Sequence, residues 1–205
     1  SDIQPDGVLH AAVVRSRHVH AIIQSIDTSA AESIEGVKAI VTRDQLLGQF
    51  DNRVRYYGDV IAAVAATTHE LAIKAAESII PTFEPLPSIH DPKKAIQSGS
   101  PKVHDVNNPN FGQHGRHEFV VENSEYVQNI DDYHYIHIGD VEKGFLEADF
   151  IFEHEYVSPR VNPCNLDTHC TIAEWDGDTV VFTETLGAPS RSRDEIADLL
   201  GMPHE

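Results

Sequence analysis

The chain has 205 residues and a formal net charge of −18, because 33 Asp and Glu outnumber 15 Lys and Arg. A surface this negative repels phosphate groups, so nucleic acid and anionic membrane are not expected as partners. Hydrophobic residues make up 40% of the chain, an ordinary share, and no apolar run approaches the roughly 20 residues that cross a bilayer. The polar start SDIQPDG does not resemble a signal peptide, and two cysteines make no disulfide framework, so we expect a cytoplasmic protein.

The N-terminal part of the chain predicts strands joined by short helices. Stretches rich in Val, Ile and Ala, which are typical of strands, occur at 8–16, 20–27 and 37–42. Between the second and the third, the stretch TSAAES predicts a short helix with Thr28 or Ser29 as its N-cap and Gly36 as its end. A further short helical turn is expected to begin at Asp44.

The clearest unit follows Gly58. VIAAVAATT is an almost unbroken apolar run, the pattern of a strand buried on both faces. Thr68 then caps a predicted helix at 69–79, whose apolar residues share one face at helical spacing. IIPTFEPLPS contains three prolines and predicts an edge strand or an extended exit. We therefore expect one domain over residues 1–91, with a core of its own.

The composition changes after this module. Residues 92–129 are polar and rich in Gly, Pro and Asn, which predicts a linker or a long surface loop. A second domain is expected over 130–205. It begins with a short helix, VEKGFLEA, and a strand in which Phe150 and Phe152 alternate with Ile151.

A hairpin and a helix are expected next. TIAEWDGDTVVFTET predicts two strands joined by a turn at Gly177. SRSRDEIADLLG predicts a helix that Ser190 or Ser192 caps and that Gly201 ends.

Several of these stretches, taken in order, resemble one family. The first five resemble the a/b hammerhead domain, which opens the large, molybdenum-carrying subunit of xanthine dehydrogenases and aldehyde oxidases. They are LHAAVVRS, H-x-H-A-x-I, IDTSAAESIEGVKAIVTRDQL, GDVIAAVAATTHELAIKAAE and FEPLPSIHDPKKAI. Three later stretches resemble the start of the family's molybdopterin-binding domain: IGDVEKGFLEADFIFEHEYVSPR, LDTHCTIAEWDGD and RDEIADLLGMPHE. The resemblance implies an α+β fold: a hammerhead module followed by the first strands and helix of a second α/β domain.

The resemblance also implies a function for the complete assembly. Family members hydroxylate a carbon of an aldehyde or an N-heterocycle at a molybdenum bound to a pterin, and they pass electrons to iron–sulfur and FAD domains or subunits. This chain would be the N-terminal portion of such a large subunit, a fragment or the product of a split gene. It would frame the molybdopterin and substrate site without being catalytic alone. If it is part of an enzyme, that enzyme is a molybdopterin-dependent oxidoreductase.

The same resemblance sets the expected cofactor and partners. Molybdopterin with molybdenum is expected in the complete assembly and not on this chain alone. The expected partners are the remainder of the molybdenum subunit and the iron–sulfur and FAD subunits or domains, and homo-oligomers stay open. The alternative hypothesis is a scaffold or interaction module that kept the hammerhead fold and lost the site.

Gly187 is the candidate cofactor-binding position. In the family, a glutamine before a small residue and a proline, followed by an arginine, approaches an oxygen ligand of molybdenum. Counting back from Arg193, Ala188 and Pro189 fill this pattern and the glutamine's place falls on Gly187. Glycine has no side chain to donate a hydrogen bond, although it lets a ligand or another chain come close. A simple turn at a strand end is the other interpretation, and no catalytic residue is predicted.

The stretch NPCNLDTHC holds both cysteines. Cys164, His169 and Cys170 supply three of the four ligands of a closed zinc site. In the family the place of Cys170 is taken by a small residue, which implies that the cysteines are buried packing residues. No metal site is therefore predicted, and the alternative is an adventitious ion completed by a distant histidine such as His154.

Other polar positions carry weaker signals. In RYYGD, Gly58 matches the family's turn before the buried strand, whereas Asp59 stands where the family shows glutamine. Solvated surface or surface ion pairs are expected of the remaining close acids and arginines, which are Asp131, Asp132, Glu153, Glu155, Arg191 and Arg193.

Overall fold

The computed structural model describes residues 3–45, 51–104, 129–130, 138–166, 168–185 and 187–204. It divides into two units, Pro5–Gly139 and Asp140–Glu205 with Ser1–Gln4, called here the N-terminal and the C-terminal unit. The strands of the N-terminal unit are β1 (His10–Arg15), β2 (Ala21–Asp27), β3 (Val37–Thr42), β4 (Arg53–Val54), β5 (Val60–Ala66) and β6 (Ile80–Pro85). Its helices are α1 (Ser29–Glu32), α2 (His69–Ser78) and α3 (Pro92–Ala95), with a 3₁₀ turn, η1, at Arg43–Gln45.

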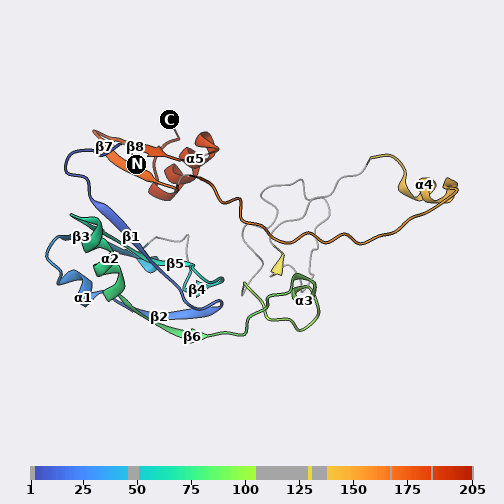
Figure 1. Ribbon diagram of the computed structural model, residues 1–205, viewed down its shortest axis with the longest axis horizontal. Coiled ribbons are helices and arrows are strands. Elements are labelled where there is room, and N and C mark those ends of the chain that lie inside the picture. The colour runs from blue at the N-terminus through green and yellow to red at the C-terminus, as the bar shows by residue number, and fades with distance from the viewer. Residues whose placement is uncertain are drawn as a thin grey trace. The chain divides into compact units, whose positions relative to one another are not determined.

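The strands of the N-terminal unit form two antiparallel sheets (Figure 1). One has the order β1-β5-β3 and the other the order β4-β2-β6. The predicted buried strand, β5, is the central strand of the first sheet, with Ile61, Val64 and Ala66 at most 1% exposed. The proline-rich strand, β6, lies at an edge, where a missing N–H breaks no pairing with a further strand.

Helices α1 and α2 contact each other, and α2 packs on β1 and β5 (Figure 1). The predicted cap of α2 is confirmed, because Thr68 Oγ1 accepts a hydrogen bond from Leu71 N at 3.2 Å. The predicted N-cap of α1 is confirmed in position as Thr28, but its side chain makes no capping hydrogen bond, and its hydroxyl donates to the Glu32 carboxylate. Asp27 accepts from Ser29 N instead, and hydrogen bonds from Ser29 lower the pKa of Asp27.

The apolar side chains of the N-terminal unit gather in two neighbouring clusters. The first is built from Ala31, Ala62, Val64, Ala75 and Ile79, and the second from Ala21, Ile23, Val54 and Ile61. Val14 and Ile26 pack against both clusters and make one continuous core. Both sheets and the helices α1 and α2 therefore share the same buried interior.

Gly36 occupies the tightest point of this unit. Its φ is +98°, and an added Cβ would lie 2.8 Å from Leu71 Cδ1 and 2.9 Å from Thr67 Oγ1. Its carbonyl oxygen also accepts a hydrogen bond from Thr67 N at 2.9 Å. Glycine is required here for both its backbone conformation and its lack of a side chain.

Arg43 is a buried cation that joins β4, the residue Asp51 before it, and the start of β5. Its guanidinium donates to the carbonyl oxygens of Asp51, Arg53 and Val60 at 2.7–3.0 Å. It also contacts the Asp59 carboxylate, with 3.0 Å between Arg43 Nη1 and Asp59 Oδ1. Arg43 and Asp59 are only 5% and 6% exposed, so each charge depends on the other.

A second buried polar chain holds β2 against β4 and the segment after β6. Arg53 Nη1 lies 2.9 Å from His20 Nε2, and His20 Nδ1 lies 2.5 Å from the carbonyl oxygen of Pro87. Because a guanidinium can only donate, Nε2 is the acceptor and Nδ1 carries the proton that is donated to Pro87. His20 is thus a buried connector between Arg53 and the carbonyl oxygen of Pro87.

The C-terminal unit contains α4 (Val141–Glu147), β7 (Thr171–Asp176), β8 (Thr179–Glu184) and α5 (Pro189–Leu200). The predicted hairpin and both helices are confirmed, and Gly201 ends α5 in the left-handed conformation with φ of 66°. The predicted serine caps are wrong, because Ala188 is the N-cap residue and Pro189 already lies inside the first turn. The strand expected around Phe150 is also wrong, since residues 148–165 carry no regular secondary structure.

Among the residues that the structure describes, no helix combines the length and the apolar composition needed to cross a lipid bilayer.

Replacing Arg43 by Met should destabilise the N-terminal unit by about 3–5 kcal/mol, because it leaves the Asp59 carboxylate buried without its cation. Native-state hydrogen exchange of the β5 amides measures the loss. Asp51→Asn is the control. The Asp51 carboxylate also contacts Arg43, but its side chain is 54% exposed, so losing this ion pair should cost less than about 1 kcal/mol. Equal costs for the two substitutions would contradict the role given to Arg43.

Gly36→Ala should destabilise the same unit by about 1–3 kcal/mol, through backbone strain at positive φ and the contact with Leu71. Gly58→Ala separates the two causes, since Gly58 has φ of +92° but nothing within 4 Å of an added Cβ. Thermal unfolding followed by circular dichroism should show a larger loss for Gly36→Ala. Similar losses would show that the close approach contributes nothing.

Candidate functional site

The candidate site lies at the open end of the β7–β8 hairpin. The two strands pair antiparallel from Asp176 opposite Thr179, next to the turn, to Thr171 opposite Glu184 at the other end. Pairing continues one step further, because Thr185 N donates to the carbonyl oxygen of Cys170 at 3.1 Å. The segment that precedes β7 and the segment that follows β8 therefore leave the hairpin side by side.

This pairing brings together two stretches that the sequence marks separately. His169 and Cys170 end the first stretch, and Gly187 lies in the turn between β8 and α5. The two stretches are well separated along the chain, so their proximity is not evident from either one alone. The sequence signal for it is the hairpin, which the alternating apolar residues of β7 and β8 and the Asp-Gly-Asp turn predict.

Gly187 is exposed, and an added Cβ would meet no atom within 4 Å. Its φ lies outside the left-handed region that favours glycine. Neither backbone conformation nor packing inside this chain therefore requires glycine at this position. The neighbouring Leu186 lies outside the described residues.

The position of Gly187 does not fit the role that the resemblance assigns to it. A molybdenum oxygen ligand would be held there by a side-chain amide, and glycine offers no side-chain donor. No chemical step through the cofactor follows from this position. What the turn offers to a neighbouring group is backbone and open space.

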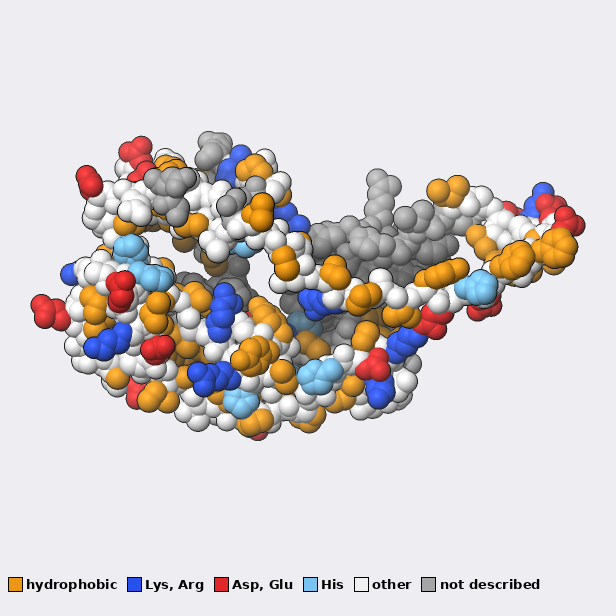
Figure 2. Space-filling model, in the orientation of Figure 1, with side chains coloured by type: hydrophobic (Ala, Val, Ile, Leu, Met, Phe, Trp, Pro, Cys, Tyr) orange, Lys and Arg blue, Asp and Glu red, His pale blue; other side chains and the backbone are white. Residues whose placement is uncertain are grey.

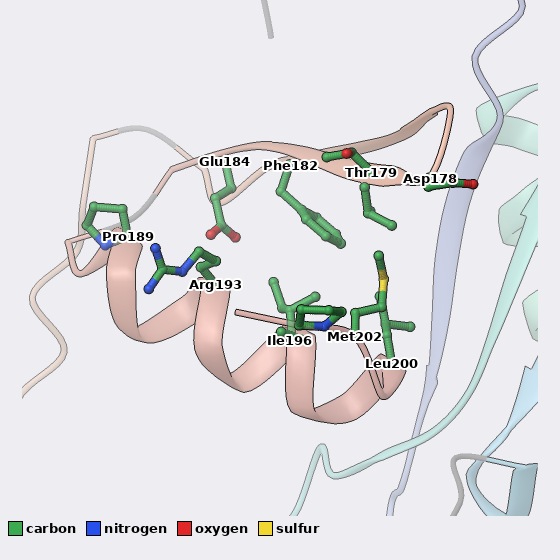
Figure 3. Close-up of a pocket in the computed structure, with 12 residues that line it drawn as sticks. Asp178, Thr179, Phe182, Glu184, Pro189, Arg193, Ile196, Leu200 and Met202 are labelled. Carbon is green, nitrogen blue, oxygen red and sulfur yellow. The ribbon is translucent and has the colours of Figure 1, made fainter. Parts of the chain in front are cut away.

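A groove of about 510 Å³ runs between β8 and α5 (Figure 3). Figure 3 shows Glu184 and Arg193 at the end near Pro189, while Phe182 and Ile196 face each other further along. Its lining is therefore apolar along most of its length and charged at the end that borders the Gly187 turn. Sequence reasoning predicts the strand and the helix but not the groove between them.

The arginines of α5 form the expected surface ion pairs. Arg191 Nε lies 2.7 Å from Glu195 Oε1, and Arg193 Nη2 lies 2.7 Å from Asp194 Oδ1. All four side chains are exposed, so each pair contributes little to stability. Arg193 keeps its charge at the mouth of the groove.

The cysteines do not behave as the resemblance implies. Cys164 and Cys170 are free and exposed, which makes the packing interpretation wrong. Cys164 has a left-handed φ of 49°, held by a hydrogen bond from its N–H to Asn162 Oδ1 at 3.0 Å. A turn stabilised by a side-chain acceptor, and not burial, explains the local structure. Within the described parts of the chain, no group of three or more His, Cys, Asp or Glu could hold a metal ion.

Comparisons with known protein families agree with the two-part organisation. Residues 1–87 match the model of the a/b hammerhead domain of aldehyde oxidase and xanthine dehydrogenase. Residues 122–205 match the model of the molybdopterin cofactor-binding domain. The fold and the order of its parts are those of molybdenum hydroxylase large subunits. The chain belongs to the aldehyde oxidase and xanthine dehydrogenase family, as the resemblance predicts.

Individual relatives support the same conclusion. The probable hypoxanthine oxidase XdhD of Escherichia coli strain K12 is 29% identical, over 93% of this chain and 24% of its own length. A probable xanthine dehydrogenase subunit of Bacillus subtilis strain 168, called here the Bacillus relative, is 31% identical, over all of this chain and 27% of its own. A solved structure of reconstituted CO dehydrogenase from Oligotropha carboxidovorans matches 99% of this chain and 27% of its own, with 27% identity and a TM-score of 0.81. The chain thus spans about a quarter of the length of these relatives.

Gly187→Gln should fold as well as the unchanged chain, with a change in the free energy of unfolding below about 0.5 kcal/mol, because the position is open and its φ unstrained. Ala197→Asp is the control, since Ala197 is 7% exposed and a buried carboxylate there should destabilise α5 on the hairpin. Hydrogen exchange of the β8 amides measures both changes. A loss for Gly187→Gln as large as that for Ala197→Asp would show that glycine is a structural requirement.

Proposed function

We propose that this chain serves as the N-terminal portion of a molybdenum hydroxylase large subunit, where it frames the molybdopterin and substrate site and is not catalytic alone. In this proposal residues 1–91 are the hammerhead domain, 92–129 the linker, and 130–205 the first part of the molybdopterin-binding domain. The observation that carries the proposal is the match of both family models, in the family's order, along one chain.

The end of the hairpin is the part proposed to face the cofactor. Thr185 lies two residues before Gly187 in the chain, and its N–H donates a hydrogen bond to the carbonyl oxygen of Cys170. The turn is exposed and therefore accessible to a neighbouring part of the assembly. Its contribution would be position and shape, because it lacks a side chain that could bind a metal ligand.

The proposed cofactor and partners follow from the relatives. The family model that matches residues 122–205 is named for the molybdopterin cofactor, and the Bacillus relative is named as one subunit of a dehydrogenase. We therefore assign to the complete assembly molybdopterin, the remainder of the molybdenum subunit, and iron–sulfur and FAD subunits or domains, in the cytoplasm. The relatives are named for hypoxanthine, xanthine and CO, so the portion that they share is proposed to be a common framework.

A second candidate function is favoured by Gly187 itself. A chain that has lost the side chain expected near molybdenum, and that tolerates glycine without any structural need for it, fits a non-catalytic scaffold that kept the fold. The two functions differ in what accompanies the chain. Finding the remaining pterin-binding part, in the same polypeptide or in a partner, favours the enzyme, and a mature protein without it favours the scaffold.

We expect the purified chain, produced in a host that makes molybdopterin, to contain substoichiometric molybdenum and to hydroxylate no aldehyde or heterocycle. When it is co-produced with the part of the Bacillus relative that follows the matched quarter, the complex should retain molybdenum. Metal analysis by mass spectrometry measures both, and the full-length Bacillus relative is the positive control. A full complement of molybdenum in the isolated chain would contradict the proposal, whereas a complex without molybdenum would favour the scaffold.

A further inference from the structure

The segment between α4 and β7 exposes an unusual amount of apolar surface. Every residue from 138 to 166 is exposed, and within this range Phe150, Phe152 and Tyr156 are 82%, 83% and 88% exposed. Isolated apolar side chains at a surface are ordinary, but a contiguous exposed apolar patch marks an interaction site. Figure 2 shows hydrophobic side chains following one another along the extended part of the chain next to α4.

The run has the periodicity of a β-strand. Residues 149–157, named here the 149–157 segment, place Phe150, Phe152, His154 and Tyr156 on one side and Ile151, Glu153, Glu155 and Val157 on the other. The rings of His154 and Tyr156 lie 6.2 Å apart, centroid to centroid, which agrees with their being on the same side. One face is therefore aromatic, and the other carries carboxylates between two aliphatic side chains.

The segment forms no strand because no strand of the described residues pairs with it. In the N-terminal unit, β5 is a regular strand because β1 and β3 pair with it on both sides. A partner strand of this kind is what the 149–157 segment lacks among the described residues. An extended chain with alternating faces can add to the edge of another sheet, where backbone bonds give affinity and side-chain pockets give specificity.

We propose that the 149–157 segment becomes a strand by pairing with an extended apolar segment that places Lys or Arg opposite Glu153. The partner belongs to the part of the molybdenum subunit that follows the region matched here, so this inference rests on the proposed function. The CO dehydrogenase chain matches 99% of this chain with only 27% of its own length, which leaves about three quarters of that chain to supply the strand. The aromatic face is then buried under the same partner.

A second copy of this chain fits the segment less well. The chain carries a net charge of −18, and two such segments paired with each other would bring their acidic faces together. Like charges across paired strands are destabilising. A basic partner strand removes this repulsion and complements the carboxylate of Glu153.

The test uses the complete chain and, as its probe, the part of the Bacillus relative that follows the matched quarter. Phe152→Asp should weaken binding of the probe by more than about tenfold, and Glu153→Pro should do the same by removing a backbone donor. Tyr57→Asp is the matched control, because Tyr57 is an aromatic residue of the N-terminal unit that is 69% exposed, and it should leave binding unchanged. Circular dichroism of each isolated variant should match that of the unchanged chain.

Hydrogen exchange supplies the second measurement. The amides of the 149–157 segment should exchange faster in the isolated chain and become protected when the probe is added. The proposal is overturned if the probe does not bind, if Phe152→Asp and Glu153→Pro bind it normally, or if protection arises from self-association. A complex that forms through this segment but holds no molybdenum leaves the docking inference intact and removes the enzymatic function. A complex that holds molybdenum and still forms with Phe152→Asp and Glu153→Pro supports the enzymatic function and overturns the docking inference.

Discussion

The buried ion pair between Arg43 and Asp59 is the interaction on which the N-terminal unit depends. Removing two charges from water is unfavourable, and the pair is tolerated only because the guanidinium also donates to three carbonyl oxygens. Those carbonyls belong to the chain around β4 and to the start of β5, while Arg43 itself follows β3. One side chain therefore ties together three separate stretches of backbone, with partners 8 to 17 residues away along the chain.

This pair also explains a departure from the family at the turn before β5. The resemblance expects a neutral glutamine where this chain has Asp59, and an acid at a buried position needs a cation. Arg43 supplies that cation, with 3.0 Å between the two charged groups. Asp59 additionally accepts a hydrogen bond from Arg55 N, so its two carboxylate oxygens serve different partners. The acidic side chain at this position is thus compensated by groups inside the same unit.

The sequence predicts those parts of the fold that are determined locally. The strand β5, the helix α2 with its Thr68 cap, and the β7–β8 hairpin each carry their own periodicity or turn signal, and each is found as predicted. The two-residue strand β4 is too short to show such a signal, whereas α3 begins with an Asp91 cap and Pro92, a local helix-start signal at the start of the stretch predicted to be a linker.

The remaining differences depend on neighbours that are distant in the chain. Nothing local to Arg43 or His20 reveals that Val60 of β5 and Arg53 of β4 are their partners. The run around Phe152 has the correct alternation for a strand, yet it forms none, because the pattern specifies only one side of a pairing. At the candidate site, the exposure of Gly187 and the hydrogen bond between Thr185 and Cys170 likewise depend on tertiary structure, which no local pattern specifies.

The two units differ in how much of their order they supply themselves. The N-terminal unit buries a continuous core shared by two sheets and two helices. In the described parts of Asp140–Glu205, Ala197 is the one buried apolar residue. An isolated hairpin and a helix of this length are each marginal in water. The segment that carries the candidate site is therefore the one whose stability must come from elsewhere. In the proposed assembly the remainder of the subunit supplies this stability, so assembly and the formation of the site are expected to be one event.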